Sequence, residues 1–170
     1  MKKIFVDMDG VLTDFNGMYT KLFDRTPAQV KADRVKKEYS EHWHSFVDQR
    51  AFAALDILPG GQKLLEFLRY TDPRFVQICI LTSAGGFDRH PDVTEQKTEW
   101  VRNHLIDWPV VVVPGRRYKA GFATSDAIII DDTYDVVTSF ISAGGTGIHH
   151  SDQRIDHTLL SLQEWINDTA

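Results

Sequence analysis

Short apolar runs alternate along this chain with amphipathic segments, and several of the runs end in polar residues. The runs predict buried strands over residues 4–7, 76–82, 110–113, 127–131 and 147–149. Apolar residues at helical spacing predict helices over 61–70, 93–105, 133–142 and 159–167. In the helix over 93–105, we expect Trp100, Val101 and Leu105 on the buried face. Strands that alternate with helices are typical of a mainly parallel sheet covered on both faces, so we expect an α/β fold.

One segment interrupts this alternation. Residues 14–58 separate the first two strands by far more than a single crossover helix requires, and they contain predicted helices over 16–23 and 30–46. Leu58-Pro59-Gly60-Gly61 then marks the return to the main fold, because proline and glycine punctuate helices and turns. We therefore expect a core domain of residues 1–13 and 59–170, with residues 14–58 as a small helical cap inserted after the first strand.

Polar side chains stand where three of the predicted strands end. These side chains form three groups along the chain: Asp7 and Asp9, Thr82 and Ser83, and Asp131 and Asp132. Gly10 follows the first group and allows a sharp turn. Ligands of open α/β sheets bind at the carboxyl ends of the strands. Carboxylates this close repel one another unless they share a cation or a proton. The pattern therefore predicts a divalent metal beside a carboxylate that does chemistry.

Four parts of the sequence resemble a known enzyme superfamily. The segment Asp-Met-Asp-Gly-Val-Leu-Thr-Asp-Phe at 7–15 resembles the first motif of the haloacid dehalogenase (HAD) superfamily, whose members are mostly phosphatases with an aspartate nucleophile. The later HAD motifs have counterparts in the right order in Thr82-Ser83, in Lys119 within a polar loop, and in Asp131-Asp132. The resemblance implies a Rossmann-like HAD core with a mainly parallel sheet of about five strands flanked by helices.

Two further segments are similar to one branch of that superfamily, the 5'(3')-deoxyribonucleotidases. They are Phe-Ala-Ala-Leu-Asp-Ile-Leu-Pro-Gly at 52–60, which looks like the exit from the cap, and Glu-Gln-Lys-Thr-Glu-Trp-Val at 95–101. The chain departs from the branch in its short cap, in an aromatic base cluster that is hard to place, and in Ala84-Gly85-Gly86, where the branch usually has proline. These departures bear on substrate identity and leave the phosphatase chemistry intact.

The resemblance implies a role for each acidic residue. Asp7 is expected to attack phosphorus as the nucleophile and form an aspartyl-phosphate, and Asp9 to act as general acid and base. Mg²⁺ prefers oxygen ligands, so it would be held by Asp7, the backbone carbonyl of Asp9 and Asp132. Asp131 would act through a water or through Lys119. One member of the late pair, Asp131 and Asp132, could instead only cap the helix that follows.

The phosphoryl group needs hydrogen-bond donors and positive charge. Thr82 is expected to bind a phosphoryl oxygen through its hydroxyl, with help from Ser83, and Gly10 would let the backbone approach the phosphate. Lys119 is the expected cation, which would also orient the nucleophile. Its neighbours Arg116 and Arg117 compete for that role.

Aromatic residues are the candidates for binding a base. Phe15 resembles a base-contacting aromatic of the deoxyribonucleotidase branch, and Trp43, Phe46 and Phe52 could also stack on a base. Aromatic residues at helical spacing are also common in protein cores, so that alternative stays open. The seven histidines show no metal-ligand spacing, and we expect them to be solvated or in loops.

Composition narrows the compartment and the partners. Acidic residues outnumber basic ones by 24 to 19, and the net charge of −5 argues against non-specific binding to nucleic acid. The only cysteine, Cys79, lies in an apolar strand, so no disulfide framework exists and a reducing compartment is expected. The apolar stretch after Lys2-Lys3 is too short for a secretion signal, and no run is long enough to cross a bilayer. We expect a cytoplasmic protein.

These observations together predict a Mg²⁺-dependent phosphomonoesterase that hydrolyses (deoxy)nucleoside monophosphates. Three alternatives stay open: a polynucleotide 3'-phosphatase, a phosphatase of another small phosphorylated metabolite, and a non-catalytic HAD-fold binding protein. The polynucleotide enzyme should carry a basic groove. The expected partner is a small phosphomonoester rather than nucleic acid or a membrane, and a homodimer is left open. Base preference, sugar preference and the choice between 5' and 3' phosphates do not follow from the sequence.

Overall fold

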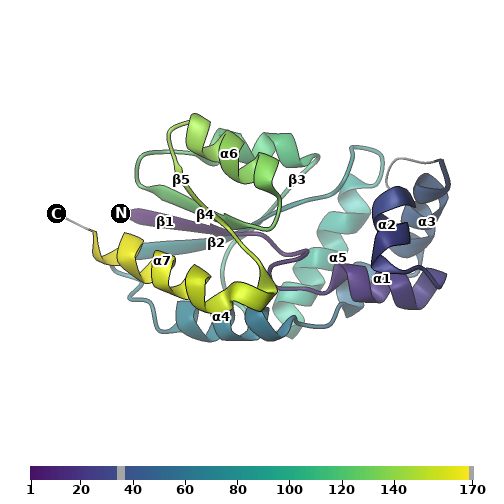
Figure 1. Cartoon of the computed structure of the whole chain (residues 1–170), viewed down its shortest axis with the longest axis horizontal. Helices are drawn as coiled ribbons and strands as arrows, with labels where there is room; N and C mark the ends of the chain where they lie inside the picture. Colours follow the sequence, from purple (N-terminus) through teal and green to yellow (C-terminus); the bar gives the residue numbers. More distant parts are fainter. Residues whose placement is uncertain (34–36, 169–170) are drawn as a thin grey trace.

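A five-stranded, entirely parallel sheet forms the centre of the molecule (Figure 1). The computed structural model describes residues 1–33 and 37–168. The strands are β1 Lys2–Val6, β2 Val76–Ser83, β3 Val110–Val113, β4 Ala127–Asp131 and β5 Thr146–His149. All five lie where the apolar runs predict them, and β3 and β4 have the predicted bounds. The predicted α/β fold with a parallel sheet of about five strands is confirmed.

Helices cover both faces of this sheet, because side chains of successive strand residues point to opposite faces. Ile4 and Val6 of β1 join a core cluster with residues of α4 Pro59–Arg69, α5 His90–Asn103 and α7 Ile155–Asn167. Phe5 points the other way and packs with residues of α6 Tyr134–Ser142. Figure 1 shows α4 and α7 on one face and α6 on the other. None of the helices in the described part of the chain is both long enough and apolar enough to span a membrane.

The strand order β3-β2-β1-β4-β5 decides where the site forms. The chain first moves outward from β1 to β2 and β3, then returns to the other side of β1 for β4 and β5. Crossovers between parallel strands are right-handed, so this reversal of direction moves the covering helix to the opposite face. Ligands of such sheets bind where the order reverses, outside the carboxyl ends of the strands. That point lies beside the carboxyl end of β1.

One detail of the helix prediction is wrong. The expected helix over 93–105 ends earlier, at Asn103 in α5, and Leu105 adopts a left-handed conformation with φ of 54°. Leu105 is therefore exposed, whereas Trp100 and Val101 are buried as expected. The side chain leaves the buried face because the helical period stops before it.

A helical insertion between β1 and α4 lies beside the carboxyl end of the sheet (Figure 1). It contains α1 Phe15–Phe23, α2 Pro27–Asp33, α3 Lys37–Asp48 and the 3₁₀ helix η1 Ala51–Ala54. The part of the predicted helix over 30–46 that falls on residues 34–36 lies outside the described residues. Because the insertion follows β1 directly, it stands next to the polar strand ends.

Buried hydrogen bonds hold this insertion against α5. The amide of Gln96 donates to the carbonyl of Val47 at 2.8 Å, and the indole N–H of Trp100 donates to the carbonyl of Leu55 at 2.7 Å. Gln96 and Trp100 are both buried, and a buried backbone carbonyl that loses its partner is costly. These buried hydrogen bonds therefore help to dock the insertion on the core.

Candidate active site

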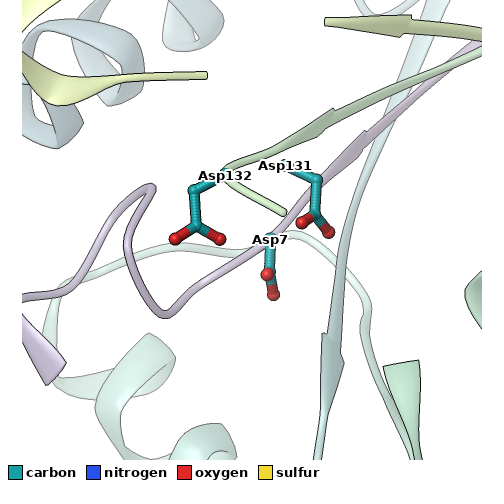
Figure 2. Close-up of side chains that lie close together, drawn as sticks. All are labelled: Asp7, Asp131 and Asp132. Atoms are coloured by element: carbon teal, nitrogen blue, oxygen red, sulfur yellow. The ribbon is translucent and has the colours of Figure 1, made fainter. Parts of the chain in front are cut away.

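Three carboxylates from two neighbouring strands converge at the switch point of the sheet (Figure 2). Val6 of β1 pairs with Ile130 of β4, so the residues that follow them leave the sheet side by side. Asp7 follows β1, Asp131 ends β4 and Asp132 comes next. Oxygen atoms of these three side chains lie within 4.8 Å of one another. The parallel register thus brings together acids that are far apart in the sequence.

Lys119 lies between two of these carboxylates. Its Nζ is 2.8 Å from Asp7 Oδ2 and 2.7 Å from Asp131 Oδ2, and the side chain is buried. Burial by itself would lower the pKa of Lys119, but the charges of Asp7 and Asp131 outweigh burial and raise that pKa. Burial would raise the pKa of Asp7, but Lys119 and Lys97 reverse this effect, so the pKa falls below its usual value. Asp7 is therefore held as a carboxylate, the form that a nucleophile requires.

The late pair of acids carries more negative charge than the nearby lysine offsets. Burial and the charge of Asp7 raise the pKa of Asp131 to about 7. Partial desolvation by the surrounding protein and the charge of Asp7 raise the pKa of Asp132 to about 6. A divalent cation would relieve this repulsion, and an all-carboxylate donor set suits Mg²⁺. The residues present therefore fit the expected metal.

Asp131 and Asp132 differ in how many of their oxygens are already engaged. Asp131 is buried and accepts hydrogen bonds from Lys119 Nζ and, at 2.9 Å, from the backbone N–H of Thr133. Asp132 is exposed and lines a cavity. Its Oδ1 accepts a 3.3 Å hydrogen bond from the hydroxyl of Thr133. Asp132 thus has the more available oxygens of the two.

A second charged group, centred on Lys97, lies beside the first. Lys97 Nζ is 2.7 Å from Asp9 Oδ2, 2.8 Å from Thr82 Oγ1 and 2.9 Å from the carbonyl of Ser83. Lys97 is fully buried, and its Nζ lies 4.9 Å from the centre of the Phe52 ring. Asp9 also accepts a 3.2 Å hydrogen bond from Thr13 Oγ1. One lysine therefore connects the expected acid–base residue to the expected phosphate-binding strand end.

Sequence reasoning assigned no role to Lys97, although a signal for it existed. Lys97 lies four residues after Val93 and three before Trp100, and both of these are buried core residues of α5. A lysine on the apolar face of a helix is a buried charge, and buried charges need partners. Those partners come from the loop after β1 and from the end of β2, so the helix pattern alone could not identify them.

Gly10 allows the first loop to approach Asp132. Its φ of 82° lies in the left-handed region, which favours glycine. A Cβ at this position would overlap the carboxylate of Asp132. The group that Gly10 approaches in this structure is Asp132, and the expected approach to a phosphate stays a prediction.

Most of the predicted site residues line one cavity of about 710 Å³, a volume within the usual range for small-molecule sites. The predicted residues that line it are Asp7, Asp9, Phe15, Trp43, Thr82, Ser83, Arg116, Arg117, Lys119 and Asp132. Phe46 and Phe52 are fully buried and do not line it. Phe15 is 6% exposed and packs on Phe46 with ring centres 4.9 Å apart. The cavity therefore meets only the edge of the aromatic cluster of the insertion.

Trp43 packs against Gly85, in the loop that follows Ser83. Gly85 has a φ of 76°, and a Cβ there would come within 2.9 Å of the Trp43 ring. The indole from α3 thus packs directly on the backbone of the loop after β2. Within the segment 84–86, where the branch usually has proline, this contact therefore favours a glycine at position 85.

His150 lies in the loop after β5, within the expectation for the histidines, but it is not solvated. This residue is buried, and its Nδ1 lies 3.0 Å from Thr158 Oγ1, while its Nε2 has no hydrogen-bond partner among the described residues. Burial lowers the pKa of His150. His149, by contrast, is exposed, and its Nε2 lies 3.0 Å from the carbonyl of Asp132. The described residues place no histidine in the carboxylate cluster.

Comparisons with known proteins identify a family and a shared fold. Residues 1–167 match the model of one family, described as 5' nucleotidase, deoxy (pyrimidine), cytosolic type C protein. A hydrolase from Pseudomonas syringae is 17% identical with a TM-score of 0.55, covering 95% of this chain and 90% of its own. A hydrolase from Streptococcus pneumoniae TIGR4 is 14% identical with a TM-score of 0.54, covering 95% of this chain and 100% of its own. The comparison with curated proteins gave no match. The two structures show a shared fold.

Proposed function

Because this chain belongs to the family of the 5' nucleotidase, deoxy (pyrimidine), cytosolic type C proteins, a branch of the HAD phosphatases, we propose that it hydrolyses (deoxy)nucleoside monophosphates to nucleoside and phosphate. One observation carries the proposal. Asp7, Lys119 and Asp132 line the same cavity as Asp9 and Thr82, so a nucleophile, a cation, a metal-binding carboxylate and a proton carrier face one space.

In the first half-reaction, Asp7 is the nucleophile. An oxygen of its carboxylate attacks phosphorus, and the bond between phosphorus and the leaving oxygen breaks, which gives an aspartyl-phosphate. The lowered pKa of Asp7 supports this role, because the attacking carboxylate is unprotonated. Lys119 keeps the carboxylate in position through its 2.8 Å contact and offsets its charge as the dianionic phosphoryl group approaches.

Asp9 is the proposed proton carrier in both half-reactions. Its carboxyl group donates a proton to the leaving oxygen and then accepts one from the water that attacks the aspartyl-phosphate. Its partly buried side chain lines the cavity, and Thr13 and Lys97 hold one oxygen each. We assign Lys97 as a positioning residue for Asp9 and Thr82, since it contacts both.

Asp7, Asp132 and the backbone carbonyl of Asp9 would hold Mg²⁺, with Asp131 acting through Lys119 or a water. When bound, the ion supplies charge neutralisation on the phosphoryl oxygens. Asp131 is suited to a supporting role, because its oxygens already accept bonds from Lys119 and Thr133. Thr82, Ser83 and Gly10 are the expected phosphate contacts, and Thr82 is buried at the end of β2.

The helical insertion is proposed as the cap over the core domain of residues 1–13 and 59–170. Within it, Phe15 and Trp43 line the cavity and are the candidates for contact with a base. Phe52 lies behind them, with its ring centre 5.9 Å from Phe15 and 5.4 Å from Trp43, so it supports the pocket rather than lining it. The family description also supports a cytoplasmic location.

The test is phosphate release by the purified protein with Mg²⁺ and with chelator. Substrates are 5' and 3' (deoxy)nucleoside monophosphates, ribose 5-phosphate and a 3'-phosphorylated oligonucleotide. We expect the nucleoside monophosphates to be hydrolysed most efficiently, only with the metal. Asp7→Asn should abolish release and keep the fold, because the replaced group is nearly isosteric. Full activity of that variant contradicts the assignment of the nucleophile.

The same set of substrates separates the proposed function from the three alternative functions. Preference for the oligonucleotide would identify a polynucleotide 3'-phosphatase, and preference for ribose 5-phosphate a sugar phosphatase. Binding of Mg²⁺ and nucleotide without any phosphate release would identify a non-catalytic binding protein.

A further inference from the structure

Two exposed aromatic residues line the cavity from the core domain rather than from the cap. Phe87 lies in the loop after β2 and is 67% exposed, and Tyr118 lies in the 3₁₀ helix η2 Arg116–Phe122 and is 39% exposed. Both line the cavity that contains Asp7. Their ring centres are 6.0 Å apart at an interplanar angle of 82°. Neither residue belongs to the two core clusters.

Tyr118 is held in place by its neighbour in the chain. The guanidinium of Arg117 lies 4.9 Å from the centre of the Tyr118 ring, and its Nη2 donates a 3.0 Å hydrogen bond to the Tyr118 hydroxyl. In the described part of the chain, Arg117 has no carboxylate within ion-pair distance. A ring fixed in this way loses little conformational freedom when a flat ligand stacks on it.

The aromatic residues of the cap offer much less free surface. Phe15 is nearly buried, and Phe46 and Phe52 are fully buried, because these rings pack on one another. Trp43 is partly buried and lies against Gly85, two residues before Phe87. The aromatic lining of the cavity therefore continues from Trp43 of the cap to Phe87 and Tyr118 of the core.

We propose that Phe87 and Tyr118 bind the base of the leaving nucleoside from the core side of the cavity, and so favour substrates with a base over sugar phosphates. This inference rests on the proposed function and deepens it by assigning the base contact to residues outside the cap. A flat π-face on the ligand matches the exposed rings, and stacking of a base on an aromatic side chain tolerates any base. Arg117 acts as a positioning residue for Tyr118.

The experiment compares two substrates that have the same ribose 5-phosphate group, with and without a base: a nucleoside 5'-monophosphate and ribose 5-phosphate. In Phe87→Ala and Tyr118→Ala, we expect KM for the nucleotide to rise about 5- to 150-fold, the loss typical of one stacking contact. KM for ribose 5-phosphate should stay unchanged. Equal changes for both substrates, or no change for either, would overturn the assignment.

Matched controls come from exposed aromatic residues away from the cavity. Phe75 is 66% exposed with Arg74 over its ring, and Tyr70 is 91% exposed. Neither lines the cavity, so Phe75→Ala and Tyr70→Ala should leave both KM values unchanged. A rise in the nucleotide KM in these controls as well would count against a specific base site.

A direct binding measurement keeps this inference separate from the proposed function. Calorimetric titration of a nucleoside monophosphate into Asp7→Asn, with and without Phe87→Ala, needs no turnover. We expect the added Phe87→Ala change to weaken binding by the same factor as it raises KM. If the wild type releases phosphate from no substrate, the proposed function fails, while unchanged binding in this titration rejects the base site by itself.

Discussion

Lys97 Nζ and Asp9 Oδ2 lie 2.7 Å apart, although 88 residues separate them along the chain. Lys97 belongs to α5, which otherwise packs into the core, and Asp9 belongs to the loop after β1. The same ammonium also reaches Thr82 Oγ1 and the carbonyl of Ser83. A single buried charge thus connects the helix to two strand ends of the site.

Replacing this charge should impair catalysis far more than folding. In Lys97→Met, a side chain of similar length fills the space, but Asp9 loses its ion pair and Thr82 loses a donor. We expect kcat to fall by about 10²- to 10⁴-fold, the range for misplacing an acid–base group. The measurement is steady-state phosphate release, with thermal unfolding to check the fold.

Lys63→Met is the matched control for that variant, because Lys63 is exposed on α4. Its kcat should equal that of the wild type. A Lys97→Met protein that keeps its kcat and only raises KM would show that Lys97 binds substrate without positioning Asp9.

Mg²⁺ should stabilise the folded protein through the carboxylate cluster. A ligand that binds only the folded state adds about 2.7 kcal/mol when present at 100 times its dissociation constant. We therefore expect a higher thermal midpoint in Mg²⁺ than in chelator. Asp132→Asn should remove this difference, because Asp132 offers its oxygens to the cavity.

Asp156→Asn, at an exposed acid of α7 outside the cluster, should retain the full difference. An identical midpoint with and without Mg²⁺ in the wild type would reject the metal site.

Gly85 should tolerate no side chain, for two separable reasons. Its left-handed backbone disfavours alanine by about 1–2 kcal/mol, and a Cβ would also collide with Trp43. Gly144 has a φ of 97° with nothing within 4 Å of the Cβ position, so Gly144→Ala reports the backbone cost alone.

We expect both alanine variants to lower the free energy of unfolding, measured by denaturant titration. Only Gly85→Ala should also raise KM for the nucleotide, because it displaces Trp43 from the cavity wall. Equal KM values in the two variants would mean that Trp43 does not contribute to binding.

His150 should make stability depend on pH. Burial depresses its pKa in the folded state below the value of about 6.5 for an unfolded chain, so the unfolded chain binds the proton more tightly. The stabilising contribution is therefore complete above pH 6.5 and is lost as the pH falls through the depressed pKa.

Unfolding titrations at several pH values below 7.5 test this. In His150→Gln, the decline in stability toward low pH should be shallower than in the wild type. His157→Gln, at an exposed histidine of α7, should keep the wild-type slope. Parallel slopes in all three proteins would remove His150 as the cause.

The strands and the acidic strand ends were predictable because both are local signals. An apolar run such as 127–131 buries itself in any fold that has a core, and the alternation with helices leaves few topologies besides a parallel sheet. The resemblance of the segments at 7–15 and 131–132 to HAD motifs depends on residue types and their order alone. For the same reason, Asp7, Asp132 and Lys119 could be predicted as site residues from the sequence alone.

The roles of Lys97, Phe87 and Gly85 depend on distances between segments that are remote in sequence. Helical spacing places Lys97 on a buried face, but only the packing of α5 beside the strand ends brings Asp9 and Thr82 to its ammonium. Phe87 looks like any other loop aromatic until the cavity is known. The sequence determines which segments are buried and which carry charge, because these properties belong to each residue. The tertiary structure decides which of those charges and rings meet, because that depends on strand order and register.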